Sequence, residues 1–258
     1  MSGAALRVGL IGPGSIGTVV HQALAAGEVA GCRLSGVIGR SDGPEALDQL
    51  VAESDVIVEA AGQEVLRTRG PAVTDAGCAL LVLSVGALVD DSLLERLRNG
   101  AGRVLVSTGA VGGLDWLRAA RLGGGLQQVD LRTTKTPSAV VQPWMDADVR
   151  EQLLAAADPI TAFRGPATDA VKLFPASVNV AATLALATVG FDALDVEVVA
   201  DPAASLVEHR IAARGELGSI EVTIRNVASP HNPRTSAITP YAALRALDDL
   251  GAGLVVGV

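Results

Sequence analysis

Apolar runs with the length of strands alternate with amphipathic stretches along the N-terminal part of the chain. The runs lie at 8–11, 33–38, 55–59, 79–85 and 103–107. The stretches between them, where apolar side chains recur at helical spacing, lie at 15–26, 45–52, 63–76 and 90–99. We expect the third of these helices to be interrupted at Gly70-Pro71. Strands that alternate with helices form parallel βαβ units, so the pattern predicts an α/β fold with a doubly wound parallel sheet over residues 1–109.

The pattern changes after about Gly109. Further strands are expected at 126–134, 161–165, 196–201, 206–213 and 220–226. A long apolar helix is expected from Phe174 to Val189, between the second and third of them. These elements predict a C-terminal α+β domain with an open mixed sheet over residues 110–236. A last amphipathic helix follows, and we expect residues 237–258 to pack back on the first domain.

Composition limits the classes of partner. Hydrophobic residues make up 49% of the 258 residues but aromatic residues only 2%, so the core is built from Val, Leu, Ile and Ala. The formal net charge of −8 disfavours binding to nucleic acid, because an acidic chain repels phosphate backbones. No apolar run is long enough to span a bilayer, and the N-terminus has no signal-peptide core. Cys32 and Cys78 lack metal-ligand spacing. We therefore expect a cytoplasmic protein with no metal site, no membrane segment and no nucleic-acid partner.

A glycine-rich turn, Gly-Pro-Gly-Ser-Ile-Gly, follows the first apolar run. Gly12 permits the sharp turn out of the strand, Gly14 lets the backbone approach a pyrophosphate, and Gly17 lets the helix pack closely. Ser15 and Ile16 begin the helix, whose free N–H groups and positive dipole end attract phosphates. The turn lies between a strand and a helix, which is the context that this motif requires. It therefore predicts a Rossmann domain that binds NAD or NADP.

The end of the second strand departs from the usual NAD pattern. An acid is expected there to bind the ribose 2′-hydroxyl, but Gly39 stands near its place and Arg40 follows. A guanidinium binds phosphate in bidentate fashion, so Arg40 suits the 2′-phosphate of NADP. We predict that NADP is tolerated or preferred; the alternative is a solvated loop arginine.

Two histidines of the second domain are candidates for general acid–base catalysis. His209 lies in an expected strand, and His231 lies in the polar, proline-rich segment 226–236. A structural histidine remains the alternative for each. The same segment holds a fixed cation, Arg234, which suits an anionic substrate or a structural latch. Asn179 is unusual on a buried helical face unless its amide is hydrogen-bonded.

Seven segments in this order and spacing resemble the NAD(P)-dependent L-aspartate dehydrogenase family, and the resemblance covers essentially the whole chain. They are Gly-Pro-Gly-Ser-Ile-Gly at 12–17, Val-Glu-Ala-Ala at 58–61, Ser-Thr-Gly-Ala-Val-Gly-Gly-Leu-Asp at 107–115, Thr-Lys-Thr-Pro at 134–137, Phe-Pro-Ala-Ser-Val-Asn-Val-Ala-Ala at 174–182, the strand of His209, and Asn-Pro-Arg-Thr-Ser at 232–236. The resemblance implies that Ala110 and Asn179 contact NAD and that His209 is the catalytic histidine.

The resemblance also implies a reaction. L-aspartate is oxidised to iminoaspartate, which gives oxaloacetate and ammonia, and the reverse is reductive amination; supply of iminoaspartate for NAD biosynthesis is one family role. Lys135, Arg234, Thr235 and Ser236 are candidates to hold the two substrate carboxylates, or to pin loops. We expect a homodimer, because an open sheet commonly finds a second copy. Three alternatives stay open: a related imine reductase, an amino acid dehydrogenase with another small acidic substrate, and a non-catalytic NAD(P)-binding sensor.

Overall fold

The computed structural model describes residues 4–174, 179–230 and 232–257. The chain divides into two compact units. The first consists of Met1–Gly109 together with Thr239–Val258, and the second of Ala110–Ile238.

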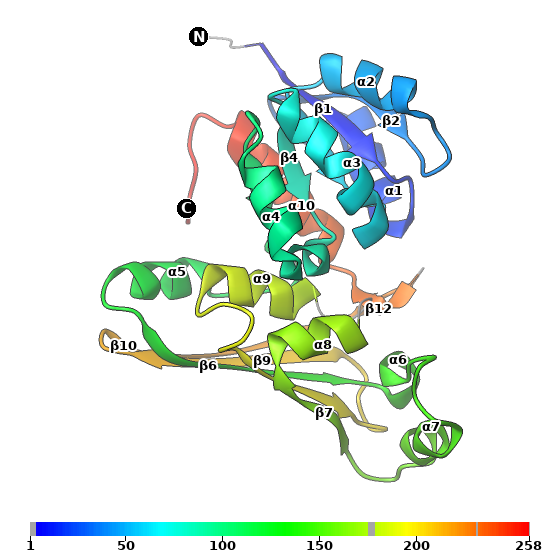
Figure 1. The fold of residues 1–258 in the computed structure, drawn as a ribbon, viewed down its shortest axis with the longest axis vertical. Helices are drawn as coiled ribbons and strands as arrows, with labels where there is room; N and C mark the ends of the chain where they lie inside the picture. The colour runs from blue at the N-terminus through cyan, green and yellow to red at the C-terminus, as the bar shows by residue number, and fades with distance from the viewer. Residues whose placement is uncertain (1–3, 175–178, 231, 258) are drawn as a thin grey trace. The chain divides into compact units, whose positions relative to one another are not determined.

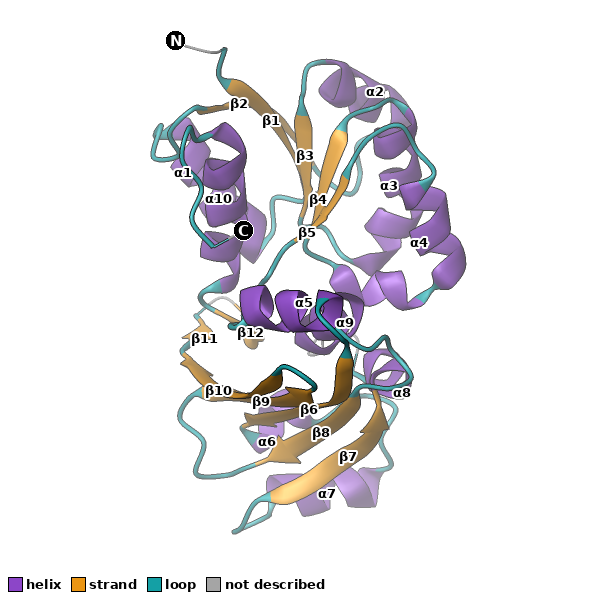
Figure 2. Ribbon diagram, turned by 90° about the vertical axis from the view of Figure 1, so that its left-hand side faces the viewer, coloured by secondary structure: helices purple, strands orange, loops and turns teal. Residues whose placement is uncertain are grey.

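The first unit is built on a five-stranded sheet in the order β2-β1-β3-β4-β5, and all its strand pairs are parallel. Its strands are β1 (Leu6–Ile11), β2 (Cys32–Ile38), β3 (Val56–Glu59), β4 (Ala79–Val82) and β5 (Val104–Val106). Its helices are α1 (Ser15–Ala25), α2 (Pro44–Ala52), α3 (Gln63–Asp75), the 3-10 helix η1 (Val85–Val89), α4 (Asp91–Arg98) and α10 (Thr239–Gly251). Figure 2 shows α1 and α10 on one side of this sheet and α2, α3 and α4 on the other. The predicted doubly wound parallel sheet is confirmed.

The C-terminal helix completes the core of the first unit. Ala243 and Leu247 of α10 are fully buried in one cluster with Val20 and Leu24 of α1. The thiol of Cys32 in β2 donates a hydrogen bond to the carbonyl oxygen of Leu247, 3.4 Å away. The last helix therefore belongs to the first unit, although more than a hundred residues separate it from the rest of that unit.

Helix α3 runs without a break through Pro71, so the expected interruption is wrong. A proline removes one backbone donor and crowds the preceding turn. Next to the proline, Gly70 allows α3 to approach α4: a Cβ at that position would lie 3.1 Å from a methyl of Leu97. Helices α3 and α4 thus pack closely next to the proline.

The second unit is built on a mixed sheet in the order β10-β9-β6-β8-β7. Its strands are β6 (Leu126–Lys135), β7 (Ile160–Pro166), β8 (Asp195–Ala200), β9 (Val207–Gly215) and β10 (Gly218–Asn226), with β11 (Ala228–Ser229) and β12 (Asn232–Ser236) in a separate two-stranded sheet. Its helices are α5 (Leu114–Leu122), α6 (Pro137–Val140), α7 (Ala147–Leu154), α8 (Ala167–Leu173) and α9 (Asn179–Ala187). Only β6 and β8 pair in parallel; the other three pairs of the large sheet are antiparallel. The predicted open mixed sheet is confirmed.

Helices cover one face of the large sheet. In Figure 1, α5, α8 and α9 lie over this face. Alternate residues of β9, from Val207 to Ala213, are buried, while those between them are half-buried or exposed. The open face carries ion pairs between neighbouring strands: Arg132 with Glu197, Arg210 with Glu221, and Arg225 with Glu208. This alternation fixes which side chains of each strand point under the helices.

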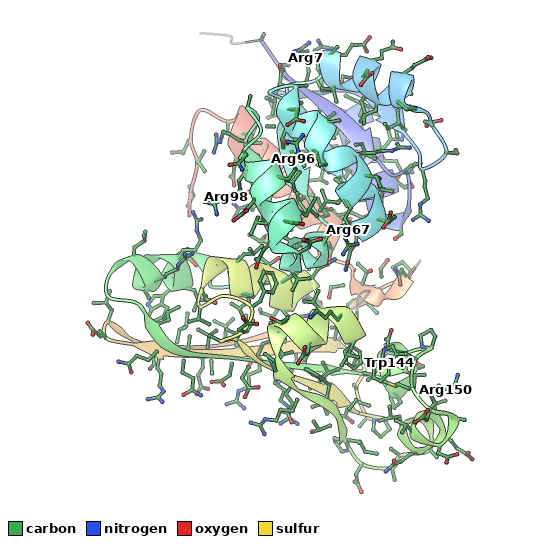
Figure 3. The ribbon with its side chains drawn as sticks, in the orientation of Figure 1. Arg7, Arg67, Arg96, Arg98, Trp144 and Arg150 are labelled. Atoms are coloured by element: carbon green, nitrogen blue, oxygen red, sulfur yellow. The ribbon has the colours of Figure 1, made fainter. Side chains whose placement is uncertain are left out.

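The expected apolar helix does not begin at Phe174, so that boundary is wrong; residues 175–178 of the same expectation lie outside the described residues, and 179–187 is helical as expected. Phe174 ends α8, where its N–H bonds to the carbonyl oxygen of Ala170, and α9 is described only from Asn179. The ring of Phe174 is fully buried and packs edge-on against Phe163 and Trp144, the latter labelled in Figure 3. These ring contacts explain why an apolar residue stands where a helix ends.

Among the residues that the structure describes, no helix has both the length and the apolar character needed to cross a bilayer.

Candidate active site

The glycine turn has the geometry that a dinucleotide requires. Gly12 has a φ of +101°, and a Cβ there would lie 2.6 Å from the Cα of Ala61. A Cβ at Gly17 would lie 1.9 Å from the carbonyl oxygen of Gly12, so only glycine lets α1 start this close to the strand. A Cβ at Gly14 would meet no protein atom within 4 Å, although Gly14 caps α1. The space beside Gly14 is therefore open to a ligand at a helix N-terminus.

A pocket of about 640 Å³ brings the turn together with Arg40. It is lined by Gly12, Pro13, Gly14, Gly39, Arg40, Ser41, Ala60 and Ala61. One terminal nitrogen of the Arg40 guanidinium donates to the carbonyl oxygen of Ala61, 3.1 Å away. The exposed arginine is thus anchored at the pocket instead of moving freely in solvent. Ser15 and Ile16 form the first turn of α1 next to it.

Arg69, which the sequence did not single out, holds the loop that carries Arg40. Its guanidinium donates to three carbonyl oxygens of this loop, those of Gly39, Arg40 and Asp42, at 3.0, 2.9 and 2.6 Å. The carboxylate of Asp42 in turn accepts a bond from the N–H of Gly39 at 2.6 Å. An arginine on a helix gives no sequence signal of such a contact, because its partners are backbone atoms of a distant loop.

Glu59 is a second functional candidate that the sequence did not single out. It ends β3, and only 1% of its surface is exposed. Burial raises the pKa of its carboxyl, while hydrogen bonds from Gly62, Ser84 and Ala61 act in the opposite direction. The sequence signal that could have identified Glu59 is an acidic residue at the end of the otherwise apolar strand Val-Ile-Val-Glu.

In the second unit, His209 lies buried on the helix-covered face of the sheet. Only 2% of its surface is exposed. It stands opposite Thr133 in the antiparallel pair of β9 and β6. The hydroxyl oxygen of Thr133 lies 3.0 Å from Nδ1 of His209 and forms a hydrogen bond with it. The ring is therefore held in one orientation by a neighbouring strand.

Lys135 shares the site with His209. It lies two residues after Thr133 on the same face of β6 and is 3% exposed. Burial lowers the pKa of His209 to about 3, and the positive charge of Lys135 adds to this effect. The imidazole is therefore neutral at ordinary pH. His231, the other candidate histidine, lies outside the described residues.

The remaining candidates of the second unit occupy different elements. Ala110 is buried at the start of this unit. Asn179 is the first described residue of α9 and is exposed, so the expectation of a buried helical face is wrong there. Thr235 and Ser236 lie on β12, in the small sheet. The side chain of Arg234 lies outside the description.

Two family models together match most of the chain. The model described as "Aspartate dehydrogenase, C-terminal" matches residues 115–250. The model described as "Homoserine dehydrogenase, NAD binding domain" matches residues 12–105. The second match covers the glycine turn and strands β2, β3 and β4 of the parallel sheet, and the first covers the sheet that bears His209.

Relatives of similar length support the same family. An L-aspartate dehydrogenase of Methanosarcina acetivorans is 33% identical and covers 94% of this chain and 96% of its own. One of Ruegeria pomeroyi is 36% identical over 98% of this chain and 95% of its own. The crystal structure of aspartate dehydrogenase from Thermotoga maritima superposes with a TM-score of 0.76 at 25% identity, over 97% of this chain and 99% of that one. The chain belongs to the L-aspartate dehydrogenase family.

Proposed function

We propose that this protein oxidises L-aspartate with NAD or NADP to iminoaspartate, which water converts to oxaloacetate and ammonia. The observation that carries the proposal is the buried, neutral His209, bonded to Thr133 and close to the cation Lys135. Such a group can accept a proton from a substrate amine or water, and the cation can hold a carboxylate. The reverse reaction, reductive amination, uses the same groups.

The cofactor is held by the first unit in this proposal. Gly14 lets the pyrophosphate approach the backbone, Gly12 and Gly17 allow the sharp turn and the close start of α1, and the N–H groups of Ser15 and Ile16 bind the pyrophosphate oxygens. Ala110 and Asn179 are proposed as further NAD contacts, as the family resemblance implies. When bound, the nicotinamide ring supplies the acceptor for the hydride that leaves the substrate Cα.

Arg40 is proposed to bind the 2′-phosphate of NADP. It lines the nucleotide pocket at the end of β2, where no acid stands to bind a ribose hydroxyl. Its bond to the carbonyl oxygen of Ala61 uses one terminal nitrogen, so the rest of the guanidinium fork can face a phosphate. NADP is therefore accepted and competes with NAD.

His209 acts as the base in this proposal. In the tautomer that carries hydrogen on Nδ1, that N–H donates to the hydroxyl oxygen of Thr133 and Nε2 is the acceptor nitrogen. Nε2 takes the proton from the substrate amino group, or from the water that attacks the imine. Thr133 thus holds the plane of the ring without touching the substrate, and its hydroxyl can pair with either tautomer.

The positive charge of Lys135 also affects how strong a base His209 is in this proposal. A substrate carboxylate paired with Lys135 offsets the ammonium charge that lowers the pKa of His209. Binding of the acidic substrate therefore makes the imidazole a stronger base at the moment it is needed. Arg234, Thr235 and Ser236 are proposed to hold the other carboxylate.

A substrate panel tests the proposed function. Purified protein is incubated with NAD or NADP and with L-aspartate, D-aspartate, L-glutamate or L-alanine, and the reduced cofactor is followed. We expect kcat/KM for L-aspartate to exceed the others by about a hundredfold. Cofactor binding without turnover of any amino acid would instead indicate an NAD(P) sensor. Preference for another acid would indicate a related dehydrogenase.

We also propose that the enzyme is a cytoplasmic homodimer. Both cysteines, Cys32 and Cys78, are free thiols, which suits a reducing compartment. The large sheet has an open face, and such a face commonly packs against a second copy of the chain. Sedimentation at equilibrium should give twice the chain mass.

A further inference from the structure

Glu59 is a buried carboxylate that the proposed reaction does not use. It stands at the carboxyl end of β3, the edge of the parallel sheet where ligands of such folds bind. A buried charge is costly unless several donors compensate for it, so its place needs an explanation.

The carboxylate of Glu59 collects four donors from two separate loops. One oxygen, Oε1, accepts from the N–H of Ala61, the N–H of Gly62 and the hydroxyl of Ser84, each at 2.9 Å. The other, Oε2, accepts from the N–H of Ser84 at 3.1 Å. Gly62 caps α3 and Ser84 caps η1, so the charge also faces the positive ends of two helices. A single side chain therefore fixes the loop after β3 to the loop after β4.

The loop after β3 forms a wall of the nucleotide pocket. Ala60 and Ala61 line this pocket together with the glycine turn. The backbone of Ala61 is so close to Gly12 that a Cβ at Gly12 would lie 2.7 Å from its nitrogen. The N–H of Ala61 is bonded to Glu59, and its carbonyl oxygen is bonded to Arg40. The position of Ala61 thus determines both how closely the glycine turn packs against this loop and where the guanidinium of Arg40 is anchored.

We propose that Glu59 is a positioning residue for the dinucleotide. It holds the Ala61–Gly62 backbone in the position that leaves room for the pyrophosphate at Gly12 and anchors Arg40. The inference rests on the proposed function only in that the pocket binds NAD or NADP. Its effect appears in cofactor affinity and requires no turnover of L-aspartate.

The structure explains why the residue is a carboxylate. All four partners are donors, and an ionised carboxyl offers only acceptors. In Glu59→Gln the amide oxygen can keep the bonds to Ala61 and Gly62, but the amide nitrogen is then directed at the N–H of Ser84. Two donors face each other there, so the loops must move apart.

The test is cofactor affinity in Glu59→Gln. We expect the Kd of NADH and of NADPH, measured by titration of cofactor fluorescence without amino acid, to rise by about tenfold or more. The control is Asp90→Asn. Asp90 is also an acid that accepts backbone N–H bonds at a helix start of this unit, from Ser92 and Leu93, but it does not line the pocket. This control should lower Tm and leave both Kd values unchanged.

An unchanged Kd in Glu59→Gln, with only a lower Tm, would overturn the proposal. If that variant does not fold, Ser84→Ala replaces it. This change removes one of the four bonds and leaves the carboxylate, and we expect a Kd about threefold to tenfold higher. An unchanged Kd in Ser84→Ala would then contradict the proposal. If the wild type binds NADH but oxidises no amino acid, the proposed reaction fails and the inference about Glu59 stands.

Discussion

The hydroxyl oxygen of Thr133 and Nδ1 of His209 lie 3.0 Å apart, on neighbouring strands of the second unit. Both side chains are at least 97% buried, with exposures of 3% and 2%. A buried imidazole with one nitrogen bonded to a neighbouring side chain has a fixed ring plane. The pair therefore sets the direction in which the other ring nitrogen can take up a proton.

Replacing Thr133 with Val should lower kcat by about tenfold, because one oriented hydrogen bond to His209 is lost. Thr133→Ser keeps the hydroxyl and should restore most of the activity. The matched control is Thr134→Val, since this neighbour points to the opposite face of β6. Steady-state rates with saturating L-aspartate measure the effect. Equal losses in the Val and Ser variants would show that Thr133 fills space and does not orient the ring.

Replacing Lys135 with Met should raise KM for L-aspartate by about tenfold to a hundredfold, because a charge-assisted bond to a substrate carboxylate is lost. The Kd of NADH should not change. The only other lysine in the sequence, Lys172, is exposed on α8, and Lys172→Met is the control. An unchanged KM in Lys135→Met would remove Lys135 from the substrate site.

Stability should fall in mild acid because of His209. The usual pKa of a histidine is 6.5, and the pKa of His209 in the folded state is about 3. Below about pH 6.5, His209 is therefore protonated in the unfolded chain but stays neutral in the folded chain. The free energy of unfolding should drop by about 1.4 kcal/mol from this group alone between about pH 7.5 and about pH 5.5.

Urea denaturation of the wild type and of His209→Gln at these two pH values measures the drop. The variant lacks the titrating group, so its loss of stability over the same interval should be smaller by that amount. Identical losses in both proteins would mean that His209 is protonated in the folded state.

Replacing Arg40 with Ala should lower kcat/KM for NADP by about tenfold to a hundredfold and affect NAD little, because only NADP carries the 2′-phosphate. Arg33→Ala, at an exposed position on β2, is the control. The ratio of kcat/KM for the two cofactors is the readout. An unchanged ratio would make Arg40 a structural arginine that only ties its loop to Ala61.

Much of the fold could be predicted because it depends on local pattern. The parallel sheet follows from short buried runs between amphipathic helices, and the nucleotide turn follows from three glycines whose missing Cβ atoms leave necessary space. The boundaries of the helices could not be predicted from the same pattern. Phe174 reads as part of an apolar helix, but ring contacts with Trp144 and Phe163 set its place at the end of α8.

The candidate site, like the fold, could be predicted from the sequence only in part. His209 could be singled out because histidines are few and its strand alternates clearly. Thr133 could not, since a threonine on a half-buried strand is ordinary until the register of β6 and β9 places it opposite His209. Arg69 acts through backbone atoms of a loop that is distant in sequence, and Glu59 joins its own loop to Ser84, 25 residues further along the chain. Their roles depend on tertiary structure and leave no spacing to read.

The role of His209 is tested most directly by the turnover of His209→Ala with L-aspartate, measured beside the Kd of NADH. The account predicts that kcat falls by about two to four powers of ten while the Kd stays within about twofold of the wild type. Turnover close to that of the wild type, in a variant that binds NADH normally, would contradict it.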